Sequence, residues 1–151
     1  MDDFDFLHGT WDVANRKLVT LFDGCTEWDE FPARSVVRPL LDGLGNLDEM
    51  SVPTRGWAGA TLRLFDLEHK TWSIYWCSSR SGRLEPPVVG GFEAGVGAFQ
   101  GDDAHEGRPI KVRFAWHVLG ADHARWEQRF SADAGETWEL NWVMDYHRVA
   151  Q

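Results

Sequence analysis

Apolar and polar residues alternate along most of this chain, so that every second side chain belongs to one face of its segment. Val112, Phe114 and Trp116 show the pattern in one segment, and Trp126, Gln128 and Phe130 show it in another. A period of two is typical of β-strands that bury one face. The pattern predicts about ten strands, over residues 9–22, 27–38, 44–51, 57–66, 71–79, 87–93, 97–101, 109–118, 123–131 and 137–148.

Short segments rich in glycine and aspartate separate these strands, for example Asp23-Gly24 and Asp42-Gly43. Such turns join neighbouring antiparallel strands. No long amphipathic helical pattern occurs, and only residues 3–8 indicate a helical turn. Even spacing of the strands favours one up-and-down barrel over a sandwich with Greek-key crossovers, and closure also removes exposed sheet edges. We therefore expect an all-β fold in which residues 1–151 form a single antiparallel up-and-down β-barrel with a short N-terminal helical turn.

Two features at the ends of the chain indicate a family. Gly9-x-Trp11 opens the first strand, and Arg148 lies near the end of the last one. This arrangement resembles the calycin superfamily, which contains lipocalins and fatty-acid-binding proteins. The resemblance implies that Trp11 plugs the floor of the barrel and that Arg148 packs across it. The chain lacks the helix pair that fatty-acid-binding proteins carry after their first strand.

Two strings extend this resemblance to a narrower group. They are Trp126-Glu127-Gln128 and the segment from Trp138 to Trp142. The chain is similar to an uncharacterised, mainly actinobacterial family of calycin-like domains. That likeness implies a calycin-like barrel and almost nothing about function.

Strand parity predicts which side chains face the lumen. If Trp11 and Arg148 point inward, an aromatic interior with a few polar groups results. Such a lining suits a small aromatic or amphipathic ligand, although the same rings could instead fill the barrel. The ligand-binding residues predicted in this way are Asn15, Arg63, Trp76, Trp116, Trp126, Gln128, Trp142 and Tyr146.

Two other functions remain open beside a carrier or sensor. A cofactor-free cyclase, isomerase or hydrolase could use the same pocket, with Glu127, Asp145, His117 or His147 as the proton-transfer group if the parity were reversed. A haem-binding barrel is the third hypothesis, because one bacterial haem family also begins with Gly-Thr-Trp. That function would need His117 or His147 inside the barrel, whereas the parity places both outside.

Two segments offer other chemistry that we interpret as structural. Ser131-x-Asp133-x-Gly135-x-Thr137-Trp138 matches the Asp-box of sialidase propellers, but it occurs once, so we expect a hairpin turn. Asp102, Asp103, His105 and Glu106 lie in a predicted loop over residues 101–107 and match no metal-binding spacing. We expect solvated side chains there, and Gly90-Gly91 is interpreted as a strand bulge or kink.

Composition narrows the partners. The 151-residue, tryptophan-rich chain carries a formal net charge of −9, which argues against nucleic acid and anionic membrane as partners. We expect a cytoplasmic protein, because no signal-peptide or membrane-span pattern occurs. Its expected partner is a small molecule in the lumen, and we expect no cofactor and no metal. Cys25 and Cys77 are expected as reduced thiols. A homodimer is left open.

Overall fold

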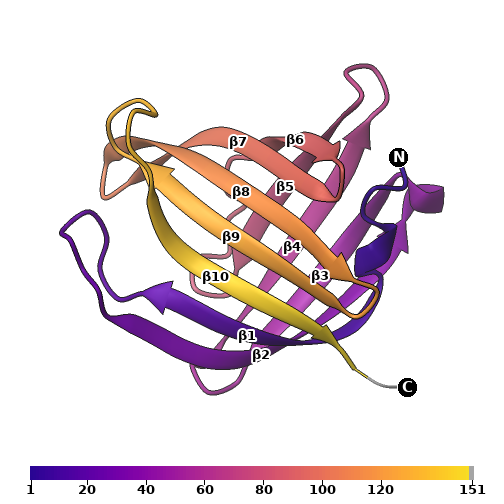
Figure 1. Cartoon of the computed structure of the whole chain (residues 1–151), viewed down its shortest axis with the longest axis horizontal. Helices are drawn as coiled ribbons and strands as arrows, with labels where there is room; N and C mark the ends of the chain where they lie inside the picture. The colour runs from indigo at the N-terminus through magenta and orange to yellow at the C-terminus, as the bar shows by residue number, and fades with distance from the viewer. Residues whose placement is uncertain (150–151) are drawn as a thin grey trace.

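Ten antiparallel strands form a closed barrel in the computed structural model, which describes residues 1–149 (Figure 1). Two short 3-10 turns accompany them, η1 (Asp5–Leu7) before the first strand and η2 (Leu41–Gly43) after the second. The strands are β1 (Gly9–Leu18), β2 (Trp28–Leu40), β3 (Gly45–Val52), β4 (Trp57–Asp66), β5 (Thr71–Ser78), β6 (Val88–Glu93), β7 (Val96–His105), β8 (Arg108–Gly120), β9 (His123–Ser131) and β10 (Glu139–Arg148).

Each strand pairs with its neighbours in sequence, and β1 closes the ring against β10. The all-β, up-and-down barrel of ten strands is therefore confirmed, as is the short helical turn in front of it. Connections alternate between two ends of the barrel (Figure 1). We call the end with η1 the floor, and the end with the β1–β2, β5–β6 and β9–β10 loops the mouth. No helix within residues 1–149 is long and apolar enough to cross a membrane.

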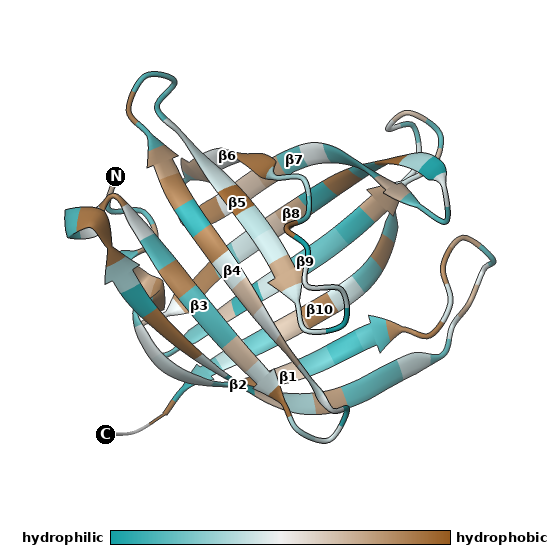
Figure 2. Ribbon diagram, turned by 180° about the vertical axis from the view of Figure 1, so that it is seen from behind, coloured by the Kyte–Doolittle hydropathy of each residue, from teal (hydrophilic) through white to brown (hydrophobic). Residues whose placement is uncertain are grey.

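Brown and teal positions alternate along the strands, as a one-sided core requires (Figure 2). Trp11, Val13 and Asn15 of β1 are buried, as are Trp142, Met144 and Tyr146 of β10. The predicted inward parity is thus confirmed for the two strands that meet at the closing seam. The apolar faces of β5, β8 and β9 are buried in the same way, through Trp72, Ile74, Val112, Trp116 and Trp126.

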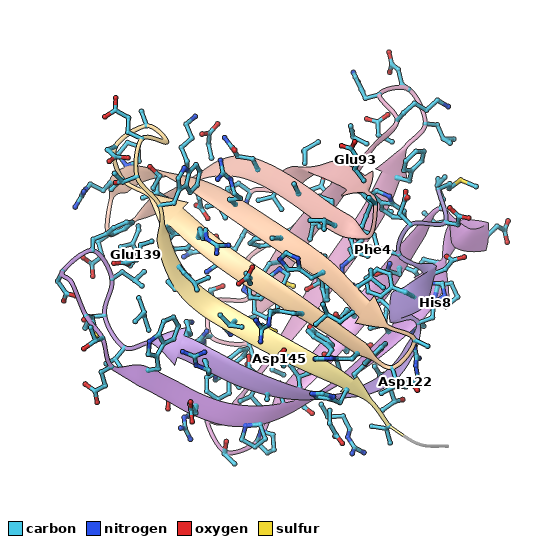
Figure 3. The ribbon with its side chains drawn as sticks, in the orientation of Figure 1. Phe4, His8, Glu93, Asp122, Glu139 and Asp145 are labelled. Carbon is cyan, nitrogen blue, oxygen red and sulfur yellow. The ribbon has the colours of Figure 1, made fainter. Side chains whose placement is uncertain are left out.

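The floor is closed by η1 and a tryptophan. Trp11 is fully buried, and its indole N–H donates to the carbonyl of Leu7 at 2.8 Å. The Arg148 guanidinium lies 4.2 Å from the centre of the Trp11 ring and donates to the carbonyls of Phe6 and His8. Figure 3 shows His8 at this end of the barrel, with Glu139 at the opposite end. The seam anticipated from Gly9-x-Trp11 and Arg148 therefore has the expected geometry.

Two strand limits differ from the sequence-based prediction by four residues, and the others differ by at most two. β1 ends at Leu18 rather than at residue 22, and the chain then crosses to β10, where the backbone N–H of Phe22 donates to the Glu139 carboxylate. β7 continues to His105, so the expected loop over residues 101–107 is wrong. Asp102 and Asp103 lie in that strand because its backbone pairs with β8 up to the two-residue turn Glu106-Gly107.

The seam between β5 and β6 is the shortest in the barrel, since it pairs only Trp72–Ile74 with Val88–Gly90. Pro86 and Pro87 precede β6, and proline has no N–H to donate to a ladder. The predicted bulge at Gly90-Gly91 is wrong, because the β6–β7 register runs through both residues without a shift. Glycine is needed at position 90 for another reason: a Cβ there would collide with the Ala98 carbonyl of β7.

The β9–β10 turn is the hairpin device expected from the Asp-box. The Asp133 carboxylate accepts hydrogen bonds from the backbone N–H and hydroxyl of Thr137 and from the buried Ser131 hydroxyl. The Trp138 indole donates to the Gly135 carbonyl at 3.0 Å, which fixes the ring beneath the turn. All of these bonds lie within the turn, so the motif has a local structural role.

Replacing Asp133 with alanine is expected to lower the melting temperature at pH 7. The Thr137 and Ser131 donors hold the pKa of Asp133 at about 2, below its usual 3.8. A carboxylate whose folded pKa is depressed stabilises the protein above its unfolded pKa, and this contribution is lost as the pH falls from 3.8 to about 2. Thermal melts should therefore show a gap between Asp133→Ala and wild type that narrows below pH 4. The neighbouring Glu136→Ala is the control, and an equal gap at every pH would contradict the assignment.

Candidate functional site

The barrel encloses a cavity of about 40 Å³ at mid-height. It is lined by the inward side chains of six strands, so the barrel is neither completely filled nor widely hollow. A buried cavity needs roughly 10–15 Å³ for each water molecule, so this one has room for a small polar group. The lining residues are Asp48, Met50, Thr61, Arg63, Ile74, Trp76, Phe114, Trp116, Trp126, Gln128, Trp142, Met144 and Tyr146.

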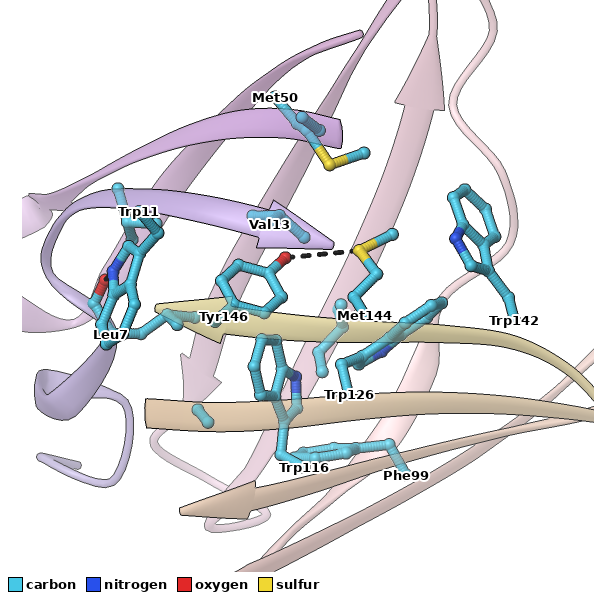
Figure 4. Close-up of a cluster of buried hydrophobic side chains, with 14 of the residues drawn as sticks. Leu7, Trp11, Val13, Met50, Phe99, Trp116, Trp126, Trp142, Met144 and Tyr146 are labelled. Atoms are coloured by element: carbon cyan, nitrogen blue, oxygen red, sulfur yellow. Dashed lines mark hydrogen bonds between the residues drawn. The ribbon is translucent and has the colours of Figure 1, made fainter. Parts of the chain in front are cut away.

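One wall of the cavity is a chain of edge-to-face aromatic rings. Trp142 contacts Trp76 and Trp126, with ring centres 5.9 and 5.4 Å apart, and Phe114 continues the chain at 5.0 Å from Trp126. Figure 4 shows Trp126, Met144 and Tyr146 grouped along β9 and β10. The Trp76 ring lies against Gly59, where a Cβ would collide with it. The rings hold one another in place, which preforms an apolar wall.

The opposite wall carries a buried ion pair. The Arg63 guanidinium of β4 donates to the Asp48 carboxylate of β3 at 3.0 Å and to the Asn46 side chain at 2.8 Å. Arg63 and Asp48 are only 2% and 3% exposed. Two of their polar atoms, Asp48 Oδ1 and Arg63 Nε, have no hydrogen-bond partner among residues 1–149. Buried polar atoms are normally satisfied, so these two lack the partner that such atoms usually have, and both residues line the cavity.

Tyr146 and Gln128 complete the polar lining. Burial, with a smaller contribution from the Asp48 charge, raises the pKa of the Tyr146 hydroxyl, so this group stays protonated. Its hydroxyl lies 3.5 Å from the Met144 sulfur (Figure 4). The Gln128 amide donates to Asn141 at 2.8 Å, which leaves its carbonyl oxygen as the acceptor of this side chain.

A second cavity of about 230 Å³ occupies the mouth. Five residues line both cavities, so the two cavities are adjacent and are bordered by the same side chains. These shared residues are Ile74, Trp76, Phe114, Gln128 and Trp142. Asp48 and Arg63 line the deeper cavity alone, so the shared aromatic rings lie between the mouth cavity and this ion pair.

Charged side chains surround the mouth. Lys17, at the last inward position of β1, and Arg80, in the β5–β6 loop, line one part of it. Glu85, Asp103 and His105 line the cavity as well. The expectation that His105 is a solvated loop residue is wrong, because its ring packs 6.0 Å from Phe22 on the inner side of β7.

The structure places seven of the eight predicted ligand-binding residues around the deep cavity: Arg63, Trp76, Trp116, Trp126, Gln128, Trp142 and Tyr146. The eighth, Asn15, is buried but does not line it. Its side-chain oxygen accepts a hydrogen bond from the Trp142 indole at 2.9 Å. Asn15 thus orients the aromatic wall, and its role as a direct ligand contact stays a prediction.

The side chains named for proton transfer or haem ligation lie on the outer face. His117 pairs with Glu127 at 3.0 Å, and Asp145 pairs with Arg125 at 3.1 Å. His147 is exposed and stacks on His123, with ring centres 4.4 Å apart. These positions follow the expected parity, so neither histidine is directed at the lumen. Within residues 1–149 no three His, Cys, Asp or Glu side chains come together as a metal site would require.

Sequence reasoning missed four polar residues of this site, namely Lys17, Asn46, Asp48 and Thr61. A usable signal existed for three of them. Asn46 and Asp48 share the parity of Met50, which is an inward apolar residue of the same strand. A buried Asp48 needs a cation, and the neighbouring predicted strand offered Arg63. Lys17 follows the inward parity of Trp11 in the same way.

Comparison with known proteins supports the fold alone. No family model matches the sequence, and no curated protein is similar enough to count as a relative. A solved structure of a protein of unknown function from the DUF3598 family of Nostoc punctiforme is similar, with a TM-score of 0.53 and 14% sequence identity. The match covers 97% of this chain and 48% of that protein, so the chain spans about half the length of its structural neighbour.

Proposed function

We propose that this protein is a calycin-like carrier or sensor that binds a small aromatic or amphipathic molecule in the barrel lumen. One observation carries the proposal: two adjacent cavities share an aromatic wall, and the deeper one is also lined by Asp48 and Arg63, whose Oδ1 and Nε atoms have no partner among residues 1–149. Small-molecule sites typically combine such apolar walls with a few polar groups that fix orientation. The Trp11 and Arg148 floor supports the calycin-like assignment.

Cavity size restricts the ligand class. The two cavities, of about 40 and 230 Å³, fall together just below the volume of typical ligand sites, which is roughly 300–1,000 Å³. One or two fused rings would suit this space, whereas a long lipid chain or a haem would not. A donor on the ring, such as a hydroxyl, would reach toward Asp48 Oδ1 while the ring rests between Trp76, Phe114 and Trp142.

The enzyme and haem alternatives receive no comparable support. Their assigned groups, Glu127, Asp145, His117 and His147, form contacts on the outer face of the barrel. Asp48 is an acid that lines the lumen, but it already neutralises Arg63. We therefore give it the role of a hydrogen-bond acceptor for the ligand.

Binding can be tested with 2-naphthol, a neutral two-ring compound with one donor. We expect saturable quenching of tryptophan fluorescence at pH 7, with calorimetry as the second measurement. Thr61→Leu places extra methyl groups in the deep cavity and should weaken binding by about 5- to 150-fold, since a change of one methylene in an apolar pocket is worth roughly 1–3 kcal/mol.

Thr10→Leu is the matched control, because Thr10 is on the outer face of β1, next to the inward Trp11. It should bind 2-naphthol like the wild type. If 2-naphthol and a panel of one-ring and two-ring compounds all fail to give a saturable signal, the proposed function is wrong. If Thr61→Leu and the wild type bound 2-naphthol equally well, the binding site would not be in the lumen.

A further inference from the structure

The mouth carries two cations that share one aromatic surface. The Lys17 ammonium lies 4.3 Å from the centre of the Trp142 ring, and the Arg80 guanidinium lies 4.3 Å from that of Trp57. The two rings meet edge to face with centres 6.2 Å apart. Trp142 also borders the deep cavity, so the cations stand directly above the path that a ligand would follow.

Neither cation has a carboxylate partner within ion-pair distance in residues 1–149. Many other cations of the barrel are paired, for example Arg16 with Glu30, next to Lys17 in sequence. Of the cations that lack such a partner among residues 1–149, Lys17 and Arg80 line the mouth cavity, in a chain whose net charge is −9. Like charges at one site repel each other, and a bound anion would remove that cost.

Charge at Lys17 is unfavourable in the protein as it stands. Burial, together with the nearby Arg80 charge, lowers the pKa of Lys17 from 10.5 to about 8, against a smaller opposing effect of Asp29 on β2. Glu85, Asp103 and His105 face the same mouth from the β5–β6 loop and β7 but lie beyond ion-pair distance of Lys17. An anionic ligand would stabilise the charged form of Lys17, because it would supply the counter-charge that this ammonium group lacks.

We propose that Lys17 and Arg80 form an anion-binding subsite, and that the ligand of this barrel is an aromatic acid. Its ring would lie between Trp76, Phe114 and Trp142, and its carboxylate would accept hydrogen bonds from Lys17 and Arg80 at the mouth. The inference rests on the proposed lumenal binding site and adds the chemical class of the ligand. It also orients the ligand, with its carboxylate at the mouth and its ring inside, where a donor on the ring would still point toward Asp48.

The matched probes are 2-naphthoate and 2-naphthamide, which differ in charge but hardly in shape. Calorimetry at pH 7 should show that the wild type prefers the carboxylate by about tenfold, as expected of charge-assisted hydrogen bonds. Lys17→Met and Arg80→Met should each bring the ratio of the two affinities toward one. Lys70→Met, in the β4–β5 turn at the floor, should keep the wild-type ratio, and Lys17→Arg should largely keep it as well.

The pH dependence separates a charge effect from a packing effect. Binding of 2-naphthoate should weaken between pH 7 and 9.5, because Lys17 loses its proton near pH 8. Lys17→Arg should remove this step, since arginine stays charged, and 2-naphthamide should show no step in either protein.

The outcomes distinguish the two proposals. If 2-naphthol and 2-naphthamide bind but 2-naphthoate is not preferred, the anion subsite is wrong and the lumenal site stands. If the preference survives in Lys17→Met and Arg80→Met, the anion binds elsewhere and the assignment of these residues is wrong. If no ring compound binds, the proposed function fails and the subsite fails with it.

Discussion

Replacing Trp11 with alanine is expected to lower the free energy of unfolding by about 4 kcal/mol, because it removes a fully buried ring and leaves a cavity. The loss extends beyond the ring itself. The hydrogen bond to Leu7 that holds η1 across the floor disappears, and Arg148 loses the aromatic face on which it rests. Chemical denaturation followed by circular dichroism would measure the effect.

Trp28→Ala is the matched control for this substitution. Trp28 begins β2 at the mouth, is only partly buried, and has the Arg16 guanidinium 4.7 Å from its ring centre. Losing such an exposed cation–π contact costs about 0.5–1 kcal/mol. If the two alanine variants were equally stable, Trp11 would not be the plug of the barrel.

The second large effect is expected at the lumenal ion pair. Arg63→Met should lower the free energy of unfolding by about 3–5 kcal/mol, because it leaves the Asp48 carboxylate buried without its cation. The double variant Arg63→Met/Asp48→Leu should recover most of this loss, since an apolar pair of similar size carries no desolvation penalty. Urea denaturation of both variants at pH 7 provides the comparison.

An exposed pair of the same type is available as the control. Arg34 donates to Asp12 at 2.9 Å, close to the 3.0 Å of the lumenal pair, but both side chains are more than half exposed. Arg34→Met should cost less than about 1 kcal/mol, as is usual for surface pairs. A similarly small cost for Arg63→Met would mean that water reaches Asp48, and the proposed role of its free oxygen would then have to be abandoned.

The sequence alone was sufficient for most of the fold, because strand alternation and turn residues are local signals. The segments around Trp116, Trp126 and Trp142 show one apolar parity each, so their inward faces could be predicted. The ends of strands at the mouth were harder to predict from the sequence. Residues 19–22 continue an apolar pattern, yet they leave the sheet because Phe22 is tied to Glu139, a contact between residues far apart in the chain.

The candidate site was predicted less completely than the fold. Large aromatic residues are expected to be buried from their residue type alone. Asp48 and Lys17 are charged residues, which are normally exposed, so their burial cannot be predicted until their neighbours are known. Their burial depends on register across the sheet, which pairs Asp48 with Thr61 and Lys17 with Trp142. Those pairings are known only from the folded structure. Asn15 was found by parity, but its function as the acceptor for Trp142 required the distance between two strands.

The short seam between β5 and β6 is the place where the barrel wall would open most easily. If the wall parts there, the remaining strands still form one continuous sheet that runs from β6 through β10 and β1 to β5. The junction of the first and last strands then lies at the centre of that sheet, held by the ladder from Trp11 to Lys17. If the barrel opened there, β5 and β6 would be the edge strands, although both come from the middle of the chain. We expect that a circular permutant with its new ends in residues 79–87 would keep all strand pairings outside the β5–β6 seam.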